Sequence, residues 1–130
     1  LAIDRGNDLV SNRFHEMHPA VVGLIKHTID AARRAGIEVS VCGEVAGKSW
    51  AVPLLYGIGL RSFSASPVYL PEVKRVIRSL RTEDTEAMAW EALEVSSYAE
   101  LKKVLDDFHE RSLCRGQTPM DGQEGESDRV

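Results

Sequence analysis

Membrane-spanning runs are missing from this sequence of 130 residues, since no apolar stretch approaches the roughly 20 residues that cross a bilayer. Residues 1–6 also lack the basic-then-apolar order of a signal peptide. Basic residues are not in excess either, because 16 Lys and Arg stand against 20 Asp and Glu, with a formal net charge of −4. We therefore expect a cytoplasmic protein that neither inserts into a membrane nor binds nucleic acid, whose backbone demands a basic surface.

Cysteine is scarce, and its two positions lie in unlike settings. Cys42 stands in an apolar run and Cys114 in a polar segment, and neither has a second Cys or His at zinc-finger spacing. This argues against a disulfide framework or a metal finger. A hydrophobic content of 43% suffices for a modest core, so we expect one domain or part of one. Because the sequence opens on Leu1 rather than Met, we expect a piece of a longer protein.

The apolar pattern predicts helices that alternate with two strands. Pro19 suits the first position of a helix and Gly36 suits its left-handed cap, which indicates a helix over 19–35. Alternating β-branched residues predict a strand over 37–42. Further along we expect a helix over 49–56 capped by Ser49, a strand over 62–65, and helices over 70–80 and 82–93.

Caps and composition define the end of the chain. Thr82 is a suitable N-cap before acidic residues, and Ser97 with Glu100 forms a capping-box pattern that opens a last helix. From Leu113 onward the sequence has almost nothing to bury. We expect residues 1–112 to form one unit and residues 113–130 to form a polar, flexible tail.

Two strands separated by a helix predict a parallel pair, because a parallel connection needs a crossover. Such pairs normally belong to a larger α/β sheet covered on both faces or to a (β/α)8 TIM barrel. In a barrel these would be the last two strands, with extra helices after them. An unpaired strand edge would then favour a homodimer.

Reacting groups of such folds gather at the carboxyl ends of the strands, where Cys42 stands. Gly43 beside it leaves room for a ligand to reach the thiol, and Glu44 could orient that thiol. Arg5 lies in an Asp-Arg-Gly loop and could grip a phosphate or carboxylate with two parallel bonds. The simpler alternatives are a buried Cys42, a Glu44 satisfied within its loop and a solvent-facing Arg5.

Other polar residues carry weaker signals. His15 and His18 flank the start of the first helix, where capping and solvent contact explain them better than phosphate transfer. Ser64 and Ser66 end the second strand and could line the floor of a pocket or merely provide packing room.

Four segments resemble one family when taken together. They are Leu-Ala-Ile-Asp-Arg-Gly-Asn-Asp at residues 1–8, Val-Cys-Gly-Glu-Val-Ala-Gly at 41–47, Gly-Ile-Gly-Leu-Arg-Ser-Phe-Ser at 57–64 and Leu-Pro-Glu-Val-Lys at 70–74. These segments and their spacing resemble Enzyme I of the bacterial sugar phosphotransferase system, a phosphoenolpyruvate (PEP)-utilising enzyme. The resemblance covers about residues 1–112.

The resemblance implies a dimeric PEP-binding TIM barrel of which this chain is the C-terminal part. With Mg2+, such an enzyme passes the phosphoryl group of PEP to a histidine of its own N-terminal domain and then to a phosphocarrier protein of the HPr type, releasing pyruvate. By the same resemblance, Arg5 would hold the substrate phosphate and Cys42 would protonate C3 of the enolate, supported by Gly43 and Glu44. The Mg2+ ligands are expected upstream of Leu1, so the chain alone is expected to be inactive.

Three alternatives remain open. Pyruvate phosphate dikinase and PEP synthase share the Cys-Gly motif, although the Asp-Arg-Gly-Asn loop at residues 4–7 favours Enzyme I. A nitrogen-related Enzyme I paralogue would look the same over these residues. The chain could also be a non-catalytic α/β module that dimerises and regulates, although Arg5 and Cys42 argue against this.

Overall fold

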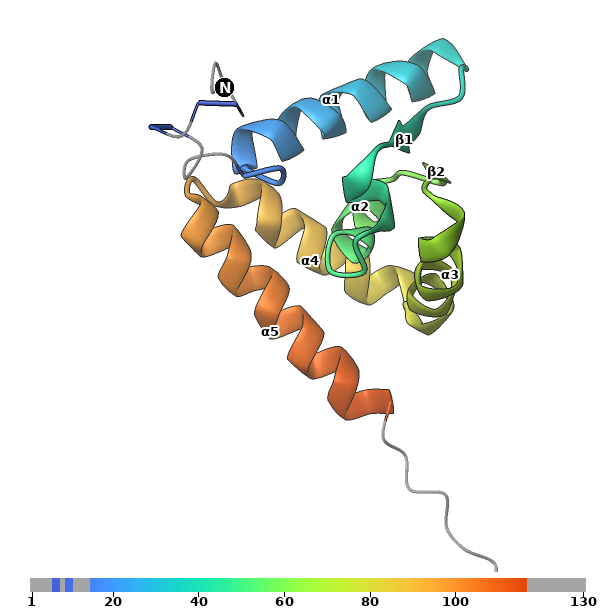
Figure 1. The fold of residues 1–130 in the computed structure, drawn as a ribbon, viewed down its shortest axis with the longest axis vertical. Helices are drawn as coiled ribbons and strands as arrows, with labels where there is room; N and C mark the ends of the chain where they lie inside the picture. Colours follow the sequence, from blue (N-terminus) through green and yellow to red (C-terminus); the bar gives the residue numbers. More distant parts are fainter. Residues whose placement is uncertain (1–5, 8, 11–14, 117–130) are drawn as a thin grey trace, which may run out of the picture.

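The structure is a computed structural model that describes residues 6–7, 9–10 and 15–116. Its elements follow in the order α1 (Pro19–Ala35), β1 (Ser40–Cys42), the 3-10 helix η2 (Glu44–Gly47), α2 (Val52–Gly57), β2 (Ser62–Ser64), the 3-10 helix η3 (Pro67–Tyr69), α3 (Leu70–Ser79), α4 (Thr82–Glu94) and α5 (Tyr98–Gly116). Figure 1 shows α4 and α5 as a helical hairpin, with α1 and the strands above it. No helix in the described part of the chain is long and apolar enough to cross a membrane.

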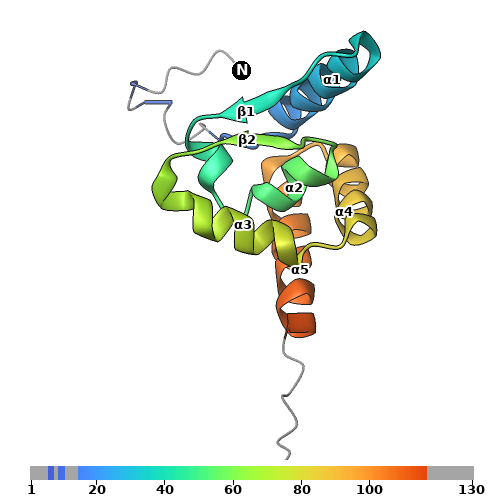
Figure 2. The ribbon, with the colours of Figure 1, turned by 90° about the vertical axis from the view of Figure 1, so that its right-hand side faces the viewer.

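The two strands form a parallel pair, as predicted, and only one face of the pair is covered. Val41 lies opposite Phe63, and both are half-buried against the helical core. The flanking residues on each strand are exposed. Figure 2 shows the strands side by side with α2 and α3 beneath them. The alternation of side chains along a strand therefore leaves one sheet face open.

The core lies between α1, α2, α4 and α5. Its largest fully buried side chains include Met17, Leu54, Leu55 and Leu101, each of which contributes about 1.5–3 kcal/mol by leaving water. Helices α2 and α4 approach closely at Gly57, where an added Cβ would stand 2.3 Å from a backbone carbonyl oxygen of α4. The core thus depends on both apolar side chains and one glycine contact.

Three predicted helix termini are confirmed. Helix α1 covers the predicted residues 19–35, and Gly36 ends it with a φ of 67°. At its start, the Nδ1 atom of His18 accepts a hydrogen bond from the Ala20 N–H at 3.2 Å. In the capping box before α5, Ser97 Oγ accepts from the Glu100 N–H at 3.2 Å, while the Glu100 carboxylate accepts from the Ser97 N–H at 3.0 Å.

Two predicted caps are wrong. Ser49 does not cap α2, which begins at Val52, because the carbonyl of Lys48 accepts the N–H groups of Ala51 and Val52 at 2.9 and 3.1 Å. The backbone already satisfies these donors, so no serine hydroxyl is needed.

Thr82 is likewise the first residue of α4 rather than its cap. The Arg81 carbonyl accepts the first helical N–H, that of Thr85, at 3.1 Å, and the Thr82 hydroxyl instead lies 3.4 Å from the hydroxyl of Tyr56.

The strands are shorter than predicted, and the last helix extends further. Strand β1 begins at Ser40 rather than Ile37, which is 65% exposed and pairs with nothing in β2. Strand β2 ends at Ser64. Helix α5 continues to Gly116, into the segment predicted as a tail, and residues 117–130 lie outside the described residues.

Candidate active-site edge of the sheet

Cys42 is the last residue of β1 and is exposed, on the uncovered face of the sheet. It lies opposite Ser64, the last and equally exposed residue of β2. In a parallel pair the carboxyl ends of the strands lie side by side, at one end of the sheet. The Cys42 thiol and the Ser64 hydroxyl therefore belong to neighbouring strands at this carboxyl edge. Of the two alternatives left open by the sequence, the structure shows an exposed rather than a buried Cys42, and its role as an acid stays a prediction.

The chain turns sharply at Gly43, which has φ 90° and ψ −170°. Only glycine adopts this backbone without strain. The turn starts η2, whose first N–H, from Ala46, reaches the Gly43 carbonyl at 3.2 Å. Gly43 therefore ends the strand immediately after the thiol and directs the chain back toward the core, where Ala46 is buried.

The segments that follow the two strands pack against each other at Gly47. A Cβ added there would lie 2.7 Å from Cδ2 of Tyr69 and 3.1 Å from its Cβ, so only glycine lets the aromatic ring close over η2. Tyr69 belongs to η3, after β2. Tyr69 could not be predicted from the sequence, because nothing local to residues 67–69 indicates its partner. The glycine at position 47 was the available signal.

Residues 15–17 are fixed beside the loop that follows η2. The Nζ atom of Lys48 donates to Oε2 of Glu16 at 2.6 Å. The ring of His15 stacks on Tyr98, with centroids 3.8 Å apart and planes 4° from parallel. Met17, next in sequence, is fully buried. These three contacts hold the described end of the N-terminal segment against the core.

The structure describes some of the predicted site residues but not all of them. Glu44 is exposed in the first turn of η2, and its predicted role in orienting the thiol stays a prediction. Ser66 is exposed and precedes η3 without capping it. Arg5 lies outside the described residues, so its predicted approach to Cys42 also stays a prediction.

The part of the chain that the structure describes offers no ligand set for a metal ion, since nowhere in it do three or more His, Cys, Asp or Glu side chains gather. The described residues at the Cys42 edge therefore do not fit an Mg2+ ion by themselves.

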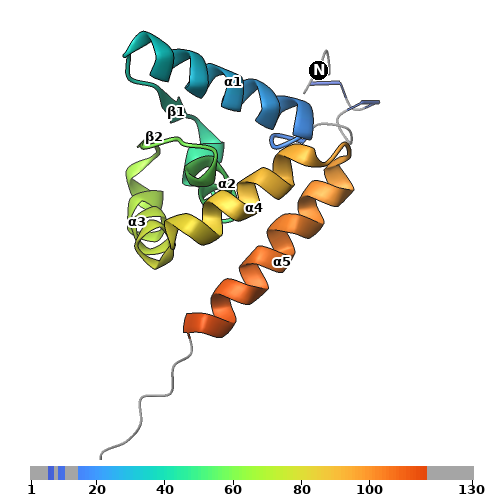
Figure 3. The same cartoon turned by 180° about the vertical axis from the view of Figure 1, so that it is seen from behind.

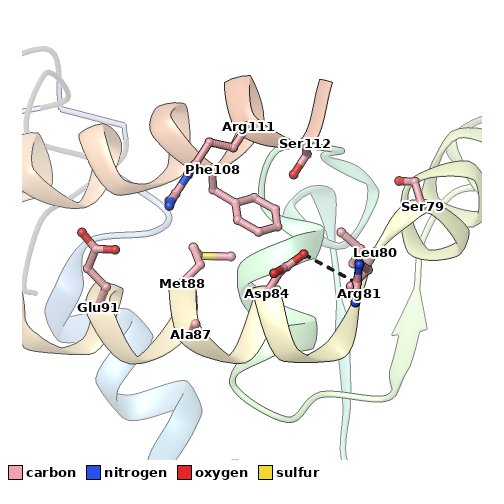
Figure 4. Close-up of a pocket in the computed structure, with 10 residues that line it drawn as sticks. All are labelled: Ser79, Leu80, Arg81, Asp84, Ala87, Met88, Glu91, Phe108, Arg111 and Ser112. Atoms are coloured by element: carbon pink, nitrogen blue, oxygen red, sulfur yellow. Dashed lines mark ion pairs between the residues drawn. The ribbon is translucent and has the colours of Figure 1, made fainter. Parts of the chain in front are cut away.

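A groove of about 540 Å³ lies apart from this edge, between α4, α5 and the turn that joins α3 to α4. Figure 4 shows Phe108 of α5 pointing toward Met88 of α4, with the ion pair of Arg81 and Asp84 at one end. A second groove of about 480 Å³ lies between Trp50 and the side chains of α5, Tyr98 included. Neither groove is lined by a strand residue, so neither extends the Cys42 edge.

Comparison with known proteins identifies the family. The family described as PEP-utilising enzyme, PEP-binding domain, matches residues 1–82. The chain belongs to the PEP-utilising enzymes. The family match includes both strands, the Cys42 edge and the two 3-10 helices, whereas α5 and all of α4 after Thr82 lie beyond it.

Within the PEP-utilising enzymes, this chain is homologous to the C-terminal region of phosphoenolpyruvate-protein phosphotransferase, or Enzyme I. It is 41% identical over 108 residues to that protein of Haemophilus influenzae, a match that covers 83% of this chain and 19% of the relative. It is 44% identical over 94 residues to that of Cupriavidus necator, covering 72% of this chain and 16% of the relative. The chain thus spans less than a fifth of the length of these relatives.

Proposed function

We propose that this chain forms the carboxyl-side part of the active site of a phosphoenolpyruvate-protein phosphotransferase, with β1 and β2 as the last two strands of a (β/α)8 barrel. The observation that carries the proposal is the exposed Cys42 thiol at the carboxyl edge of a parallel pair. Val41 and Phe63 face the helices, as outward residues of a barrel strand do. Cys42 and Ser64 point to the opposite face, which in a barrel is the interior and its rim.

Cys42 would act as the acid that completes the release of pyruvate. Once the phosphoryl group has left PEP, the remaining enolate needs a proton at C3. The S–H bond of Cys42 breaks, a C–H bond forms at C3, and the enolate C–O becomes the ketone carbonyl, which leaves a thiolate. In the reverse direction the thiolate takes a proton from the methyl group of pyruvate.

The remaining parts of the reaction are assigned by family membership. Arg5 would hold the phosphate with two parallel hydrogen bonds. An Mg2+ ion would be held by ligands in the part of the relatives that this chain does not span. The accepting histidine and the surface for a phosphocarrier protein of the HPr type would lie in the part of the relatives that this chain does not span. The protein would act in the cytoplasm as a homodimer.

The names of the relatives favour this assignment over its alternatives. Both relatives described above are phosphoenolpyruvate-protein phosphotransferases rather than dikinases or PEP synthases. A non-catalytic module would not need an open thiol beside a glycine with positive φ, because a buried small residue would pack equally well at the end of β1.

The test replaces Cys42 in the longest natural polypeptide that contains this chain. Cys42→Ala and Cys42→Ser should lower PEP turnover about 100-fold or more and abolish deuterium exchange into the pyruvate methyl group in D2O, with PEP affinity nearly unchanged. Cys114→Ala is the matched control and should behave as the wild type. Normal methyl exchange in Cys42→Ala would refute the proposed role of the thiol, whatever the rate of phosphoryl transfer.

A further inference from the structure

A small cationic pocket lies between α1, α4 and the turn that leads into β2. Its volume is about 230 Å³. The charged residues that line it are Lys26 and Arg33 of α1, Arg61 immediately before β2, and Glu86 of α4. Figure 3, the view from behind, shows α1 and α4 converging toward the end where α1 begins. The pocket is at the amino end of β2, whereas Cys42 is at the carboxyl end of β1.

Arg61 is held in one orientation and retains a free binding edge. Its Nη1 atom donates to the carbonyls of Tyr56 and Leu60 at 2.7 and 2.9 Å, and its guanidinium lies 4.2 Å from the centroid of the Tyr56 ring. A guanidinium has five N–H donors, and these bonds occupy only the two on Nη1. Within the described residues, the Nε and Nη2 donors have no acceptor. That edge is the one that binds a phosphate or carboxylate with two parallel bonds.

Arg33 reaches the same turn from the other side. Its Nη2 atom lies 2.9 Å from the position of a Cβ added to Gly59, whose φ is 106°. A side chain at position 59 would therefore both strain the turn and displace the guanidinium. Among the described residues, no carboxylate pairs with Arg33 or with Arg61. Both arginines thus line the pocket beside the turn at Gly59, and neither forms an ion pair with a described residue.

The other charges leave an excess of positive charge in this pocket. Lys26 is paired with Asp30 in the next turn of α1, so it contributes little net charge. Glu86 lines the pocket, but it forms no ion pair with either arginine in the described part of the chain. Trp90 of α4 is 64% exposed at the mouth, with the Lys26 Nζ 6.0 Å from its ring centroid.

We infer that this pocket binds a small phosphate monoester, with the phosphate between Arg33 and Arg61 and the organic part beside Trp90. A pocket of this size is below the roughly 300–1,000 Å³ of drug-sized sites, which restricts the ligand to a compact one. Inorganic phosphate shares the recognised group and is distinguished from a monoester by the test below. The inference does not depend on the proposed function.

The full 130-residue chain can report binding through Trp90. The sequence has two tryptophans, and Trp50 lines a different groove, so Trp50→Phe leaves Trp90 as the only indole. Glycerol 3-phosphate, inorganic phosphate and glycerol are titrated at constant ionic strength, because exposed charges respond to salt. A saturable change in Trp90 fluorescence is expected with glycerol 3-phosphate, a weaker one with phosphate and none with glycerol.

Substitutions in α1 and α4 test whether the change in Trp90 fluorescence comes from binding in this pocket. Arg33→Gln should weaken binding about tenfold or more, since a hydrogen bond to a charged group is lost. Arg34→Gln, next in sequence but outside the pocket lining, should leave binding unchanged. Glu86→Gln should strengthen it. Because Arg61 also holds backbone carbonyls, Arg33→Gln is the primary test, with thermal unfolding to confirm that it folds.

Several outcomes would overturn the inference. They are an unsaturable response, equal losses in Arg33→Gln and Arg34→Gln, or a response that sodium chloride reproduces. Arg5→Gln and Cys42→Ala should leave the Trp90 signal unchanged, which separates this pocket from the proposed PEP site. A loss of the signal in Arg5→Gln would likewise count against the pocket, because it would place the bound phosphate at the N-terminal loop.

Discussion

Cys42 and Ser64 are paired residues at the ends of two parallel strands, and both are exposed. Their shared edge is open because Gly43 turns the chain away directly after the thiol and Gly47 lets Tyr69 close over the returning segment. The thiol is therefore accessible through backbone geometry and close packing rather than through the movement of a loop.

Cys42 should react with a thiol reagent in the folded chain. In a Cys114→Ala background, Ellman's reagent should titrate one thiol in buffer without denaturant, because the end of β1 is exposed. Replacing the small neighbour by Ser64→Leu should slow this reaction several-fold, while Ser40→Leu, at the opposite end of β1, should not. A thiol that reacts only in denaturant would contradict the exposed placement.

Gly43→Ala should destabilise the chain by about 1–2 kcal/mol, because an alanine at φ 90° is forced into a strained backbone. Urea unfolding followed by circular dichroism measures the change. Gly23→Ala is the matched control: Gly23 lies within α1, where an added Cβ meets nothing within 4 Å, so this change should stabilise by about 0.5–1 kcal/mol. If Gly43→Ala and Gly23→Ala changed the free energy of unfolding equally, the positive φ of Gly43 would not be the cause of the destabilisation.

Gly57→Ala should destabilise the chain by about 1–3 kcal/mol for a different reason. The added methyl group would meet the Thr85 carbonyl at 2.3 Å and the Ala89 Cβ at 2.8 Å, and α4 would have to move away from α2. Thr85 is buried, and its hydroxyl donates to the carbonyls of Arg81 and Thr82, so the shift would disturb a satisfied polar group. Urea unfolding against the same Gly23→Ala control measures it, and an unchanged midpoint would contradict the close approach.

Local signals predicted the helices well, because their ends are encoded by neighbouring residues. Pro19 and Gly36 mark both ends of α1, and Ser97 with Glu100 marks the start of α5. Predictions failed where the backbone does what a side chain was expected to do. The Lys48 carbonyl replaces the Ser49 cap, and Arg81 rather than Thr82 precedes α4.

The site could be predicted in part, for a similar reason. Cys42 follows a strand-like run and precedes glycine, so its place at the end of β1 is a local property. The contact of Tyr69 with Gly47 and the approach of Arg33 to Gly59 join segments far apart in sequence. Neither hydrophobic periodicity nor composition predicts such long-range contacts, which become visible only in the folded chain.

The capping box should give the chain a pH-dependent stability. The hydroxyl of Ser97, followed by the backbone N–H groups of Ser97 and Ser96, lowers the pKa of the Glu100 carboxyl from its ordinary value of 4.5. A lowered folded-state pKa contributes stability that is present above the unfolded value and is lost as the pH falls through the folded value. Glu100→Gln should therefore be less stable than the wild type at pH 7, and the difference should shrink below about pH 4.5.

Urea unfolding at pH 7, 5 and 3 measures this difference, with Glu110→Gln as a control on the same helix. A difference that stays constant down to pH 3 would show that the ionised carboxylate does not stabilise the start of α5.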